Sequence, residues 1–417
     1  MPKGLLLTVG ASAESEIFCI RKVAPEWVAF LCTEGSRKTL DRIVNETGLK
    51  PSQYHVLEVP DTPTSTGALV MKAHEACRWL EERCGSQADI TINPTAGRKW
   101  MSMALGLFGS RTAAHQVYVE VKFSNGKPDP GTMELVDLGN AQDHTGLLDA
   151  EPAVALFNRN DFAGAASLFE RIQPLDARAR ELYRGLTGIA HALHRWDRFE
   201  HYADASTVSK EGASSLAFLK DAARELQLQQ LGRFVAQLER LLDRIREVEV
   251  SSKPSLAAVV DLVLNARRRI TASRLDDGVA RLYRALEATA QVLLKQNGID
   301  ASRVDWTRIP QEAKQKLSAQ WSVAPDGQLP EKLGLVQAFE LARALSIPGV
   351  ERFFNQQARF CYEKHLSTRN ESILAHGWKT LDESRACKFA DQLQADLEQL
   401  GADFRGWTIP EMPRLWS

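Results

Sequence analysis

The chain has 417 residues, of which 44% are hydrophobic and 25% are charged. This length indicates two or three globular domains, and the hydrophobic fraction excludes a disordered chain. Because 52 Lys and Arg face 53 Asp and Glu, no global charge attracts nucleic acid, so any such binding requires a local patch.

The cysteines and the apolar runs indicate where the protein resides. Six cysteines include no Cys-x-x-Cys pair, and several lie in apolar runs, which is typical of reduced, buried thiols. Metal and redox sites are therefore not expected. No apolar run approaches the roughly 20 residues of a membrane span, and the first residues lead into a strand-like run instead of a signal peptide. We expect a soluble, cytoplasmic protein that does not bind membranes.

Residues 1–140 alternate short apolar runs with helical patterns. The runs predict strands at residues 5–9, 28–32, 55–59, 90–92 and 117–123, and residues 67–83 have their apolar side chains at a helical period. This rhythm predicts an α/β fold with a parallel sheet and helices on both of its faces.

Small and polar residues follow three of these strands, where a parallel sheet places its ligands. They are Gly10, Ala11 and Ser12 after the first strand, Thr33 and Glu34 after the second, and Asn93, Thr95, Gly97, Arg98 and Lys99 after the fourth. Small residues let backbone N–H groups approach an anion, and two basic residues at a helix start add charge. An ordinary strand-to-helix turn explains residues 95–99 equally well. Neither a G-x-G-x-x-G motif after the first strand nor a P-loop motif is present, which disfavours dinucleotide and P-loop ATP sites.

The rest of the chain has a helical pattern. A linker-like stretch at residues 141–152 leads into residues 151–250, where residues 161–166 are echoed by 198–203 in a weak helical-hairpin repeat. We interpret this part as a helical connector. A break at 250–254 begins a last helical domain, in which residues 306–330 are expected to be irregular and residues 381–400 to form a helix. Arginines are frequent in residues 256–297 and could guide an RNA backbone, although a solvated helix face is the commoner explanation. They are Arg267, Arg268, Arg269, Arg274, Arg281 and Arg284.

The only plausible acid–base chemistry lies near the C-terminus, where Arg369, Asn370 and His376 occur together. Thr368 and Glu371 have the spacing of a capping box, so we expect a helix to begin here with Arg369 and Asn370 in its first turn. Positions 369 and 376 would then share a face, about 10 Å apart along the axis. Such a surface suits a phosphodiester. From the residues alone, a solvated helix face remains the alternative.

Two of these segments resemble a known family. Residues 93–102, Asn-Pro-Thr-Ala-Gly-Arg-Lys-Trp-Met-Ser, resemble the strand-turn-helix signature of CARF domains, the Rossmann-like sensors of CRISPR-associated proteins. Ala96 stands where the family usually has a glycine, and its methyl group restricts positive φ and close backbone approach. Arg369, Asn370 and His376 resemble the R-x4-6-H motif of HEPN ribonucleases. In this order, the two motifs resemble the CARF–HEPN ancillary ribonucleases of type III CRISPR systems.

The resemblance implies a Rossmann-like CARF sensor at residues 1–140, a helical connector at 141–250 and an all-helical HEPN domain at 251–417. It implies that the residues after the three strands bind cyclic oligoadenylate as an allosteric activator, and that Arg369, Asn370 and His376 cleave single-stranded RNA. No metal or other cofactor is expected, because RNA carries its own nucleophile in the 2′-OH, and the product would be a 2′,3′-cyclic phosphate. Since HEPN relatives build their site across a two-fold interface, the resemblance also implies a homodimer.

Three other functions stay open. The chain could be a ring nuclease that degrades cyclic oligoadenylate in the N-terminal pocket. It could also be a ligand-responsive transcription regulator, although no helix-turn-helix is evident near the C-terminus, or a non-catalytic scaffold built on its helical middle. Replacement of His376 by Ala separates these functions, since only a HEPN ribonuclease loses RNA cleavage while still binding the cyclic ligand.

Overall fold

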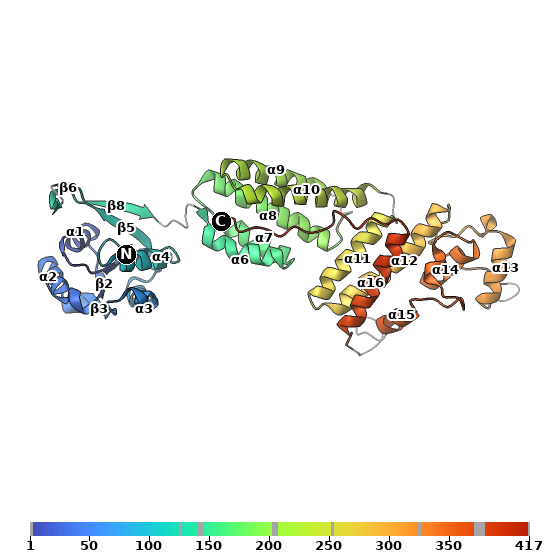
Figure 1. Ribbon diagram of the computed structural model, residues 1–417, viewed down its shortest axis with the longest axis horizontal. Helices are drawn as coiled ribbons and strands as arrows, with labels where there is room; N and C mark the ends of the chain where they lie inside the picture. Colours follow the sequence, from blue (N-terminus) through green and yellow to red (C-terminus); the bar gives the residue numbers. More distant parts are fainter. Residues whose placement is uncertain are drawn as a thin grey trace. The chain divides into compact units, whose positions relative to one another are not determined.

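The computed structural model describes residues 3–124, 127–139, 145–201, 207–251, 254–323, 327–370 and 380–415, with the backbone alone at 123–124, 127–128 and 368–370 (Figure 1). Its internal contacts define two compact units. The first comprises Met1–Glu151 and Arg171–Arg180, and the second comprises Pro152–Glu170 and Glu181–Ser417.

The first unit is built on a six-stranded sheet with the order β3-β2-β1-β4-β5-β8. The strands are β1 (Gly4–Thr8), β2 (Trp27–Cys32), β3 (Tyr54–Glu58), β4 (Ile90–Asn93), β5 (His115–Glu120) and β8 (Glu134–Gly139). The first five run parallel, which confirms the predicted sheet. β8 pairs antiparallel with β5 and extends the sheet at one edge, a strand that the sequence did not predict. A two-stranded hairpin of β6 (Phe123–Ser124) and β7 (Lys127–Pro128) lies between them in the chain.

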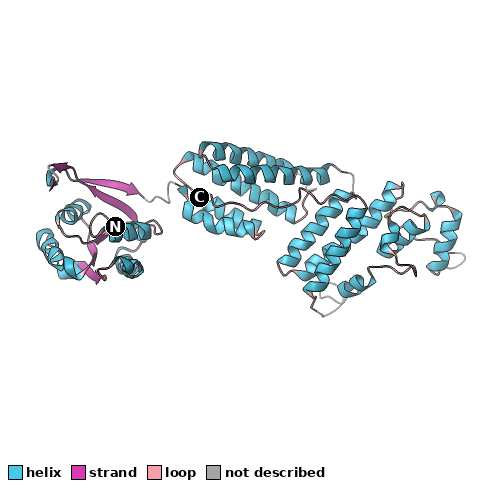
Figure 2. Cartoon of the chain, in the orientation of Figure 1, coloured by secondary structure: helices cyan, strands magenta, loops and turns pink. Residues whose placement is uncertain are grey.

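Helices cover both faces of this sheet, as predicted (Figure 2). α1 (Glu14–Val23) and α2 (Arg37–Thr47) bury their apolar residues with Leu5 and Leu7 of β1, whereas α3 (Thr66–Cys84) and α4 (Lys99–Gly109) pack with Leu6 on the opposite face. Because successive side chains of a strand point to opposite faces, a strand covered on both sides is a continuous apolar run. β1 is buried throughout for this reason.

The cysteines behave as the sequence indicated. All six are free thiols, and Cys19, Cys32, Cys77 and Cys84 are buried in the first unit. Burial raises the pKa of the Cys19 and Cys77 thiols to about 12, so neither is a nucleophile near neutral pH.

The rest of the chain is helical. The five helices α6 (Leu147–Asn158), α7 (Phe162–Arg171), α8 (Ala177–Asp197), α9 (Val208–Glu225) and α10 (Gln229–Val250) come first. They are followed by α11 (Leu256–Thr271), α12 (Leu275–Gln296), α13 (Gln311–Gln320), α14 (Leu335–Ala344), α15 (Glu363–Asn370) and α16 (Glu383–Gln399). α11, α12 and α16 contact one another, and α12 also contacts α14 and α15. Among the described residues, no helix combines the length and apolar character that crossing a bilayer requires.

Two expectations about this helical part were wrong. The proposed repeat is not structural, because Phe162 begins α7 whereas Phe199 follows the end of α8 with a φ of 65°. Residues 306–330 are not irregular throughout, since they contain a 3-10 turn at Trp306–Arg308 and the helix α13. Alanine and leucine spacing in residues 311–320 is sufficient to bury Ala313 and Leu317 despite the prolines on either side.

Candidate functional site

The loops after β1, β2 and β4 meet at one edge of the sheet. β1 pairs with β2 on one side and with β4 on the other, all in parallel, so their carboxyl ends point the same way. The sequence-predicted residues at 10–12, 33–34 and 93–99 therefore gather at the position where open parallel sheets bind ligands.

Two glycines allow the first and third of these loops to touch. A Cβ atom on Gly10 would lie 2.9 Å from the backbone nitrogen of Gly97, which is too close for any side chain. Gly97 itself has a φ of 92°, and a Cβ there would lie 3.3 Å from Cβ of Thr8. Gly97, and not Ala96, thus occupies the left-handed region, so the methyl group of Ala96 does not obstruct the turn. The carbonyl of Ala96 accepts hydrogen bonds from the hydroxyls of Thr8 and Ser102.

Asn93 and Thr95 use their polar atoms within the protein. Asn93 is buried, and its Oδ1 accepts hydrogen bonds from the nitrogen of Thr95 at 3.0 Å and from the Thr95 hydroxyl. Thr95 Oγ1 in turn accepts from the nitrogen of Val119 at 2.8 Å. These contacts attach the turn after β4 to β5. The two residues therefore have a structural role at this edge of the sheet.

Glu16 is a functional candidate that sequence reasoning missed. It is fully buried on α1, and its Oε1 accepts a hydrogen bond from the nitrogen of Gly10 at 2.9 Å. Burial raises the pKa of this carboxyl, although its hydrogen bonds with Gly10 and Ser15 oppose the shift. The available signal was an acidic residue among the apolar Ala13, Ile17 and Ile20, which recur at a helical spacing between the first two predicted strands.

Charged and small side chains are left exposed at the rim of this edge. Arg98 is exposed and forms two contacts with Asp61, from Nη2 to Oδ2 at 2.9 Å and from Nε to Oδ1 at 2.8 Å. Lys99 begins α4, and Glu34 begins the turn that precedes α2. The exposed predicted residues are Ala11, Ser12, Glu34, Arg98 and Lys99, whereas Thr33 is buried and its nitrogen donates to Ser36 Oγ at 3.0 Å.

At the C-terminal site, the predicted helix start is wrong. α15 begins at Glu363, so Arg369 and Asn370 lie at least six residues beyond its first residue. The side chains of Arg369 and Asn370, and the whole of His376, lie outside the described residues. The free N–H groups at the start of α15 therefore do not lie beside Arg369.

Packing against α16 explains the earlier start of α15. The buried Tyr362 donates its hydroxyl to Oδ2 of Asp396, and the His365 ring stacks on Phe389 with centroids 4.6 Å apart. His365 Nε2 lies 3.2 Å from Oε1 of Gln392, and burial lowers the pKa of this histidine. These anchors begin the helix upstream of the capping-box pattern, because tertiary packing outweighs a local capping preference.

Of the six predicted arginines, which lie in α11, in α12 and at position 274 between them, Arg274 and Arg284 are exposed, as expected of a solvated face. Each of the six contacts a carboxylate, and Arg268 and Arg269 are only 11% and 12% exposed. The pairs are Arg267 with Asp391, Arg268 and Arg269 with Asp197, Arg274 and Arg281 with Asp277, and Arg284 with Glu287. The six arginines share four carboxylates in these pairs, so their positive charge is partly compensated within the protein.

Within the described ranges, no group of three or more His, Cys, Asp or Glu side chains is arranged to hold a metal ion.

Comparisons with known proteins relate the chain to one family. Residues 146–243 match the family model of the Csm6 6H domain, and residues 247–399 match that of the Csm6 HEPN domain. Together the two matches span more than half of the chain. Curated protein sequences give no match.

A solved structure of a Csm6 protein extends the similarity of fold to the N-terminal unit. Enterococcus italicus Csm6 bound to cyclic hexa-2'-fluoro-hexa-dAMP has a TM-score of 0.58 and 10% sequence identity, covering 96% of this chain and 94% of that one. Can2 from Sulfobacillus thermosulfidooxidans in complex with cyclic tetra-adenylate has a TM-score of 0.23 and 14% identity, covering 48% of this chain and 68% of that one.

Proposed function

The chain belongs to the Csm6 family of CARF–HEPN ancillary ribonucleases of type III CRISPR systems, and from this we propose that it is an endoribonuclease that cleaves single-stranded RNA when cyclic oligoadenylate binds its N-terminal domain. One observation carries the proposal: an α/β unit with three loops at a common ligand edge precedes consecutive matches to the 6H and HEPN domains of one family. We assign the sensor to residues 1–140, the connector to 141–250 and the nuclease to 251–417, acting in the cytoplasm.

Cyclic oligoadenylate is the activator class that suits the edge of the sheet. The exposed residues Ser12, Arg98 and Lys99 would bind phosphates, while Gly10 and Gly97 let backbone N–H groups approach them. Arg98 would exchange its contact with Asp61 for a phosphate. Thr33, Asn93 and Thr95 would hold the loops in shape, and Ala11 and Glu34 would line the rim. E. italicus Csm6, whose fold is similar, was solved in complex with cyclic hexa-2'-fluoro-hexa-dAMP.

The residues proposed for catalysis are Arg369, Asn370 and His376. The 2′-oxygen of the RNA attacks the adjacent phosphorus while the bond to the 5′-oxygen breaks, and His376 transfers the proton between these oxygens. Arg369 would stabilise the phosphate charge, and Asn370 would orient Arg369 or bind an oxygen. The products are a 2′,3′-cyclic phosphate and a 5′-OH. Because the substrate supplies the nucleophile, we propose that no metal is required.

Exposed apolar side chains support the proposed homodimer. On α4, Met103 is 62% exposed and Leu107 is 64% exposed, and their spacing of four residues places them on one face of the helix. Met71 of the neighbouring α3 is 69% exposed. Large apolar residues that gather at a surface often mark an interface. A two-fold contact there would suit a cyclic ligand shared by two sensor domains.

A ribonuclease assay with cyclic oligoadenylates of different ring sizes tests the proposal. We expect cleavage of single-stranded RNA with one ring size, much slower cleavage without it, and full activity in EDTA. His376→Ala should abolish cleavage while binding the same activator with unchanged affinity. RNA cleavage by this variant, or loss of wild-type cleavage in EDTA, would contradict the mechanism. Destruction of the activator by His376→Ala would identify ring-nuclease activity in the sensor.

A further inference from the structure

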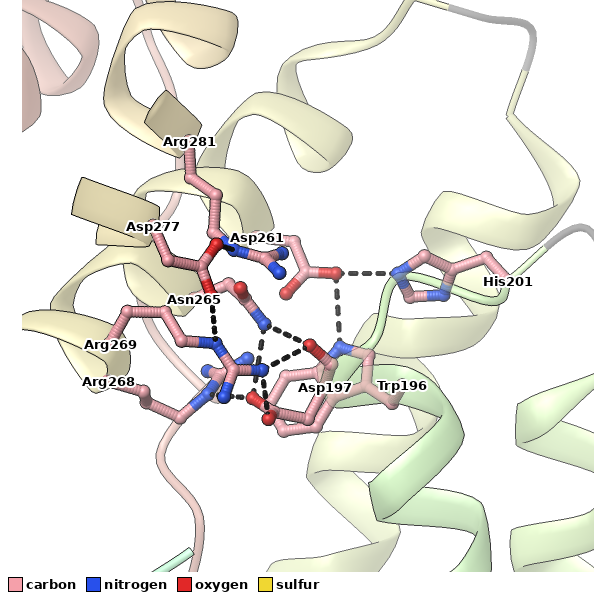
Figure 3. A network of polar contacts seen from close by, with 9 residues as sticks. All are labelled: Trp196, Asp197, His201, Asp261, Asn265, Arg268, Arg269, Asp277 and Arg281. Carbon is pink, nitrogen blue, oxygen red and sulfur yellow. Dashed lines mark hydrogen bonds and ion pairs between the residues drawn. The ribbon is translucent and has the colours of Figure 1, made fainter. Parts of the chain in front are cut away.

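A buried group of polar side chains joins the end of α8 to α11 (Figure 3). Asp197, the last residue of α8, binds three residues of α11 that lie on one face, and we call these four residues the Asp197 clamp. Asn265 Nδ2 donates to the Asp197 carbonyl at 2.9 Å, and Arg268 Nε contacts Oδ1 at 3.0 Å. Arg269 Nη2 donates to the same carbonyl at 2.8 Å and also pairs with Oδ2.

A second carboxylate on the same face of α11 points back to α8. Asp261 is fully buried one turn before Asn265, and its Oδ2 accepts a hydrogen bond from Trp196 Nε1 at 3.0 Å. The same oxygen lies 2.8 Å from His201 Nε2. The guanidinium of Arg268 stacks on Trp196, 4.0 Å from the ring centroid. Both helices therefore contribute an acidic residue to the group and receive a donor from the other.

Asp277 continues the network into α12. It pairs with Arg269 at 3.5 Å and with Arg281 at 2.8 Å. Since α12 contacts α15, which carries Arg369, a continuous series of contacts leads from the end of α8 to the helix of the proposed nuclease site.

The clamp crosses the boundary between two family domains. Asp197 belongs to the stretch that matches the 6H domain, whereas its three partners belong to the HEPN match. The chain itself already links the two domains where α10 ends at Val250 and α11 begins at Leu256. Contacts at residues 261–269 add a second point of attachment further along α11, and two such points determine the direction of a helix.

The chemistry of the clamp favours a role in geometry over one in stability. The free-energy cost of removing two charges from water offsets most of their mutual attraction. A buried apolar contact of similar size is therefore often as stabilising as a buried ion pair. Burial indeed lowers the pKa of Arg268, so desolvation outweighs its neighbouring carboxylates. A network of directional hydrogen bonds, however, accepts only a narrow range of helix positions.

We propose that Asp197 is a positioning residue that couples the helical connector to the nuclease domain, so that activator binding reaches the RNA-cleaving site only while the Asp197 clamp is intact. This inference rests on the proposed function. The clamp residues do not touch the activator or the RNA, and they act by fixing α11 and α12 relative to α8.

The test compares Asp197→Asn with a matched control in the full-length protein. Asp197→Asn keeps the shape of the side chain and removes its charge. Glu239→Gln is the control, because Glu239 pairs with Lys220 across α9 and α10, within the connector. For each variant we would measure activator affinity and the ratio of RNA cleavage rates with and without saturating activator. We expect a tenfold or greater fall in this ratio for Asp197→Asn, with activator affinity within twofold of wild type, and no change for Glu239→Gln.

Equal loss of the activated and basal rates would overturn the proposal, since that is the result of a purely structural role. An unchanged ratio in Asp197→Asn would overturn it as well. Arg269→Lys is a milder variant that keeps the positive charge but loses the several N–H donors of the guanidinium. If Asp197→Asn does not fold, Arg269→Lys takes its place and should give a ratio between that of the wild type and unity.

Amide hydrogen exchange without activator separates this proposal from the proposed function. In the wild type, the end of α8 and the middle of α11 should exchange as one cooperative unit, and in Asp197→Asn they should exchange at separate rates. If no activator stimulates wild-type cleavage, the proposed function fails, whereas separate exchange in the wild type would overturn the clamp.

Discussion

Glu16 provides a direct test of how the loop after β1 is supported. The side chain of Glu16 accepts a hydrogen bond from the backbone nitrogen of Gly10, at the edge where the three loops meet. We compare two replacements. Glu16→Ala removes the acceptor together with one buried methylene group, whereas Glu16→Gln keeps both, removes the charge and replaces Oε2, which accepts from the Ser15 hydroxyl, by an amide nitrogen. The difference between the two variants therefore isolates the support of the loop from the effect of the buried charge.

The size of this difference follows from the contacts that are lost. An unsatisfied backbone N–H costs about 1–3 kcal/mol and a lost buried methylene about 0.8 kcal/mol, so the Ala variant should be less stable than the Gln variant by roughly 2–4 kcal/mol. For a unit of about 150 residues, this corresponds to a difference in Tm of roughly 5–15 °C. Glu16→Ala should also bind the activator more weakly than Glu16→Gln, because Ala11 and Ser12 belong to the loop that loses its support.

The comparison of wild type with Glu16→Gln adds a dependence on pH. Burial raises the pKa of Glu16 above its ordinary value of 4.5. A carboxyl with a raised pKa contributes stability below that ordinary value and loses the contribution as pH rises through its pKa in the folded state. The free energy of unfolding of Glu16→Gln, minus that of the wild type, should thus increase above pH 4.5 and then level off.

Thermal unfolding of the three proteins across this pH range, followed by activator titration, measures both effects. The reasoning is refuted if the Ala variant is as stable as the Gln variant, since the hydrogen bond to Gly10 would then not support the loop. It is also refuted if the wild type gains stability over Glu16→Gln as pH rises.

Three further predictions concern other parts of the protein. Gly97→Ala should lower the Tm of the N-terminal unit, because its φ of 92° disfavours a side chain, whereas Gly106→Ala in α4, where no atom lies within 4 Å, should not lower it. Leu107→Glu should shift the dimer to monomer in sedimentation velocity and reduce activated RNA cleavage, and a variant that remains dimeric would exclude this face. Arg244→Gln should expose residues 402–415 to limited proteolysis, because Arg244 Nε donates to the carbonyl of Arg405 at 3.0 Å and its Nη2 pairs with Asp403.

The centre of the parallel sheet was predictable because β1, β2 and β4 are buried on both faces almost throughout. Such strands appear in the sequence as short continuous apolar runs, and each prediction overlaps the observed strand. β8 lacks this signal. It lies at the edge of the sheet, with side chains that are exposed or half-buried, so its sequence resembles that of a loop. Its position depends on pairing with β5, a contact between distant parts of the chain.

The ligand edge was predictable in outline and not in its internal contacts. Loops that follow parallel strands must meet, and small or polar residues identified which loops to consider. The sequence could not show that the side chains of Asn93 and Thr95 form hydrogen bonds within the turn. It also could not show that Gly97, and not Ala96, adopts the positive φ. Those outcomes depend on which backbone groups come within hydrogen-bonding distance after folding.

The arginines of α11 illustrate why charge patterns along a chain are weak evidence for nucleic-acid binding. The presence of six arginines within 42 residues is a property of the sequence, but the electrostatic effect of the three in α11 depends on carboxylates that are remote in it: Asp197 lies 71 residues before Arg268, and Asp391 lies 124 residues after Arg267. Folding brings each arginine to a carboxylate, which reduces the potential left for RNA, and the buried pairs of Arg268 and Arg269 with Asp197 restrict how α8 and α11 can move. Arg268 and Arg269, which belonged to the suggested RNA path, are therefore better understood as a link between connector and nuclease, and Asp197→Asn should impair activation without weakening RNA binding.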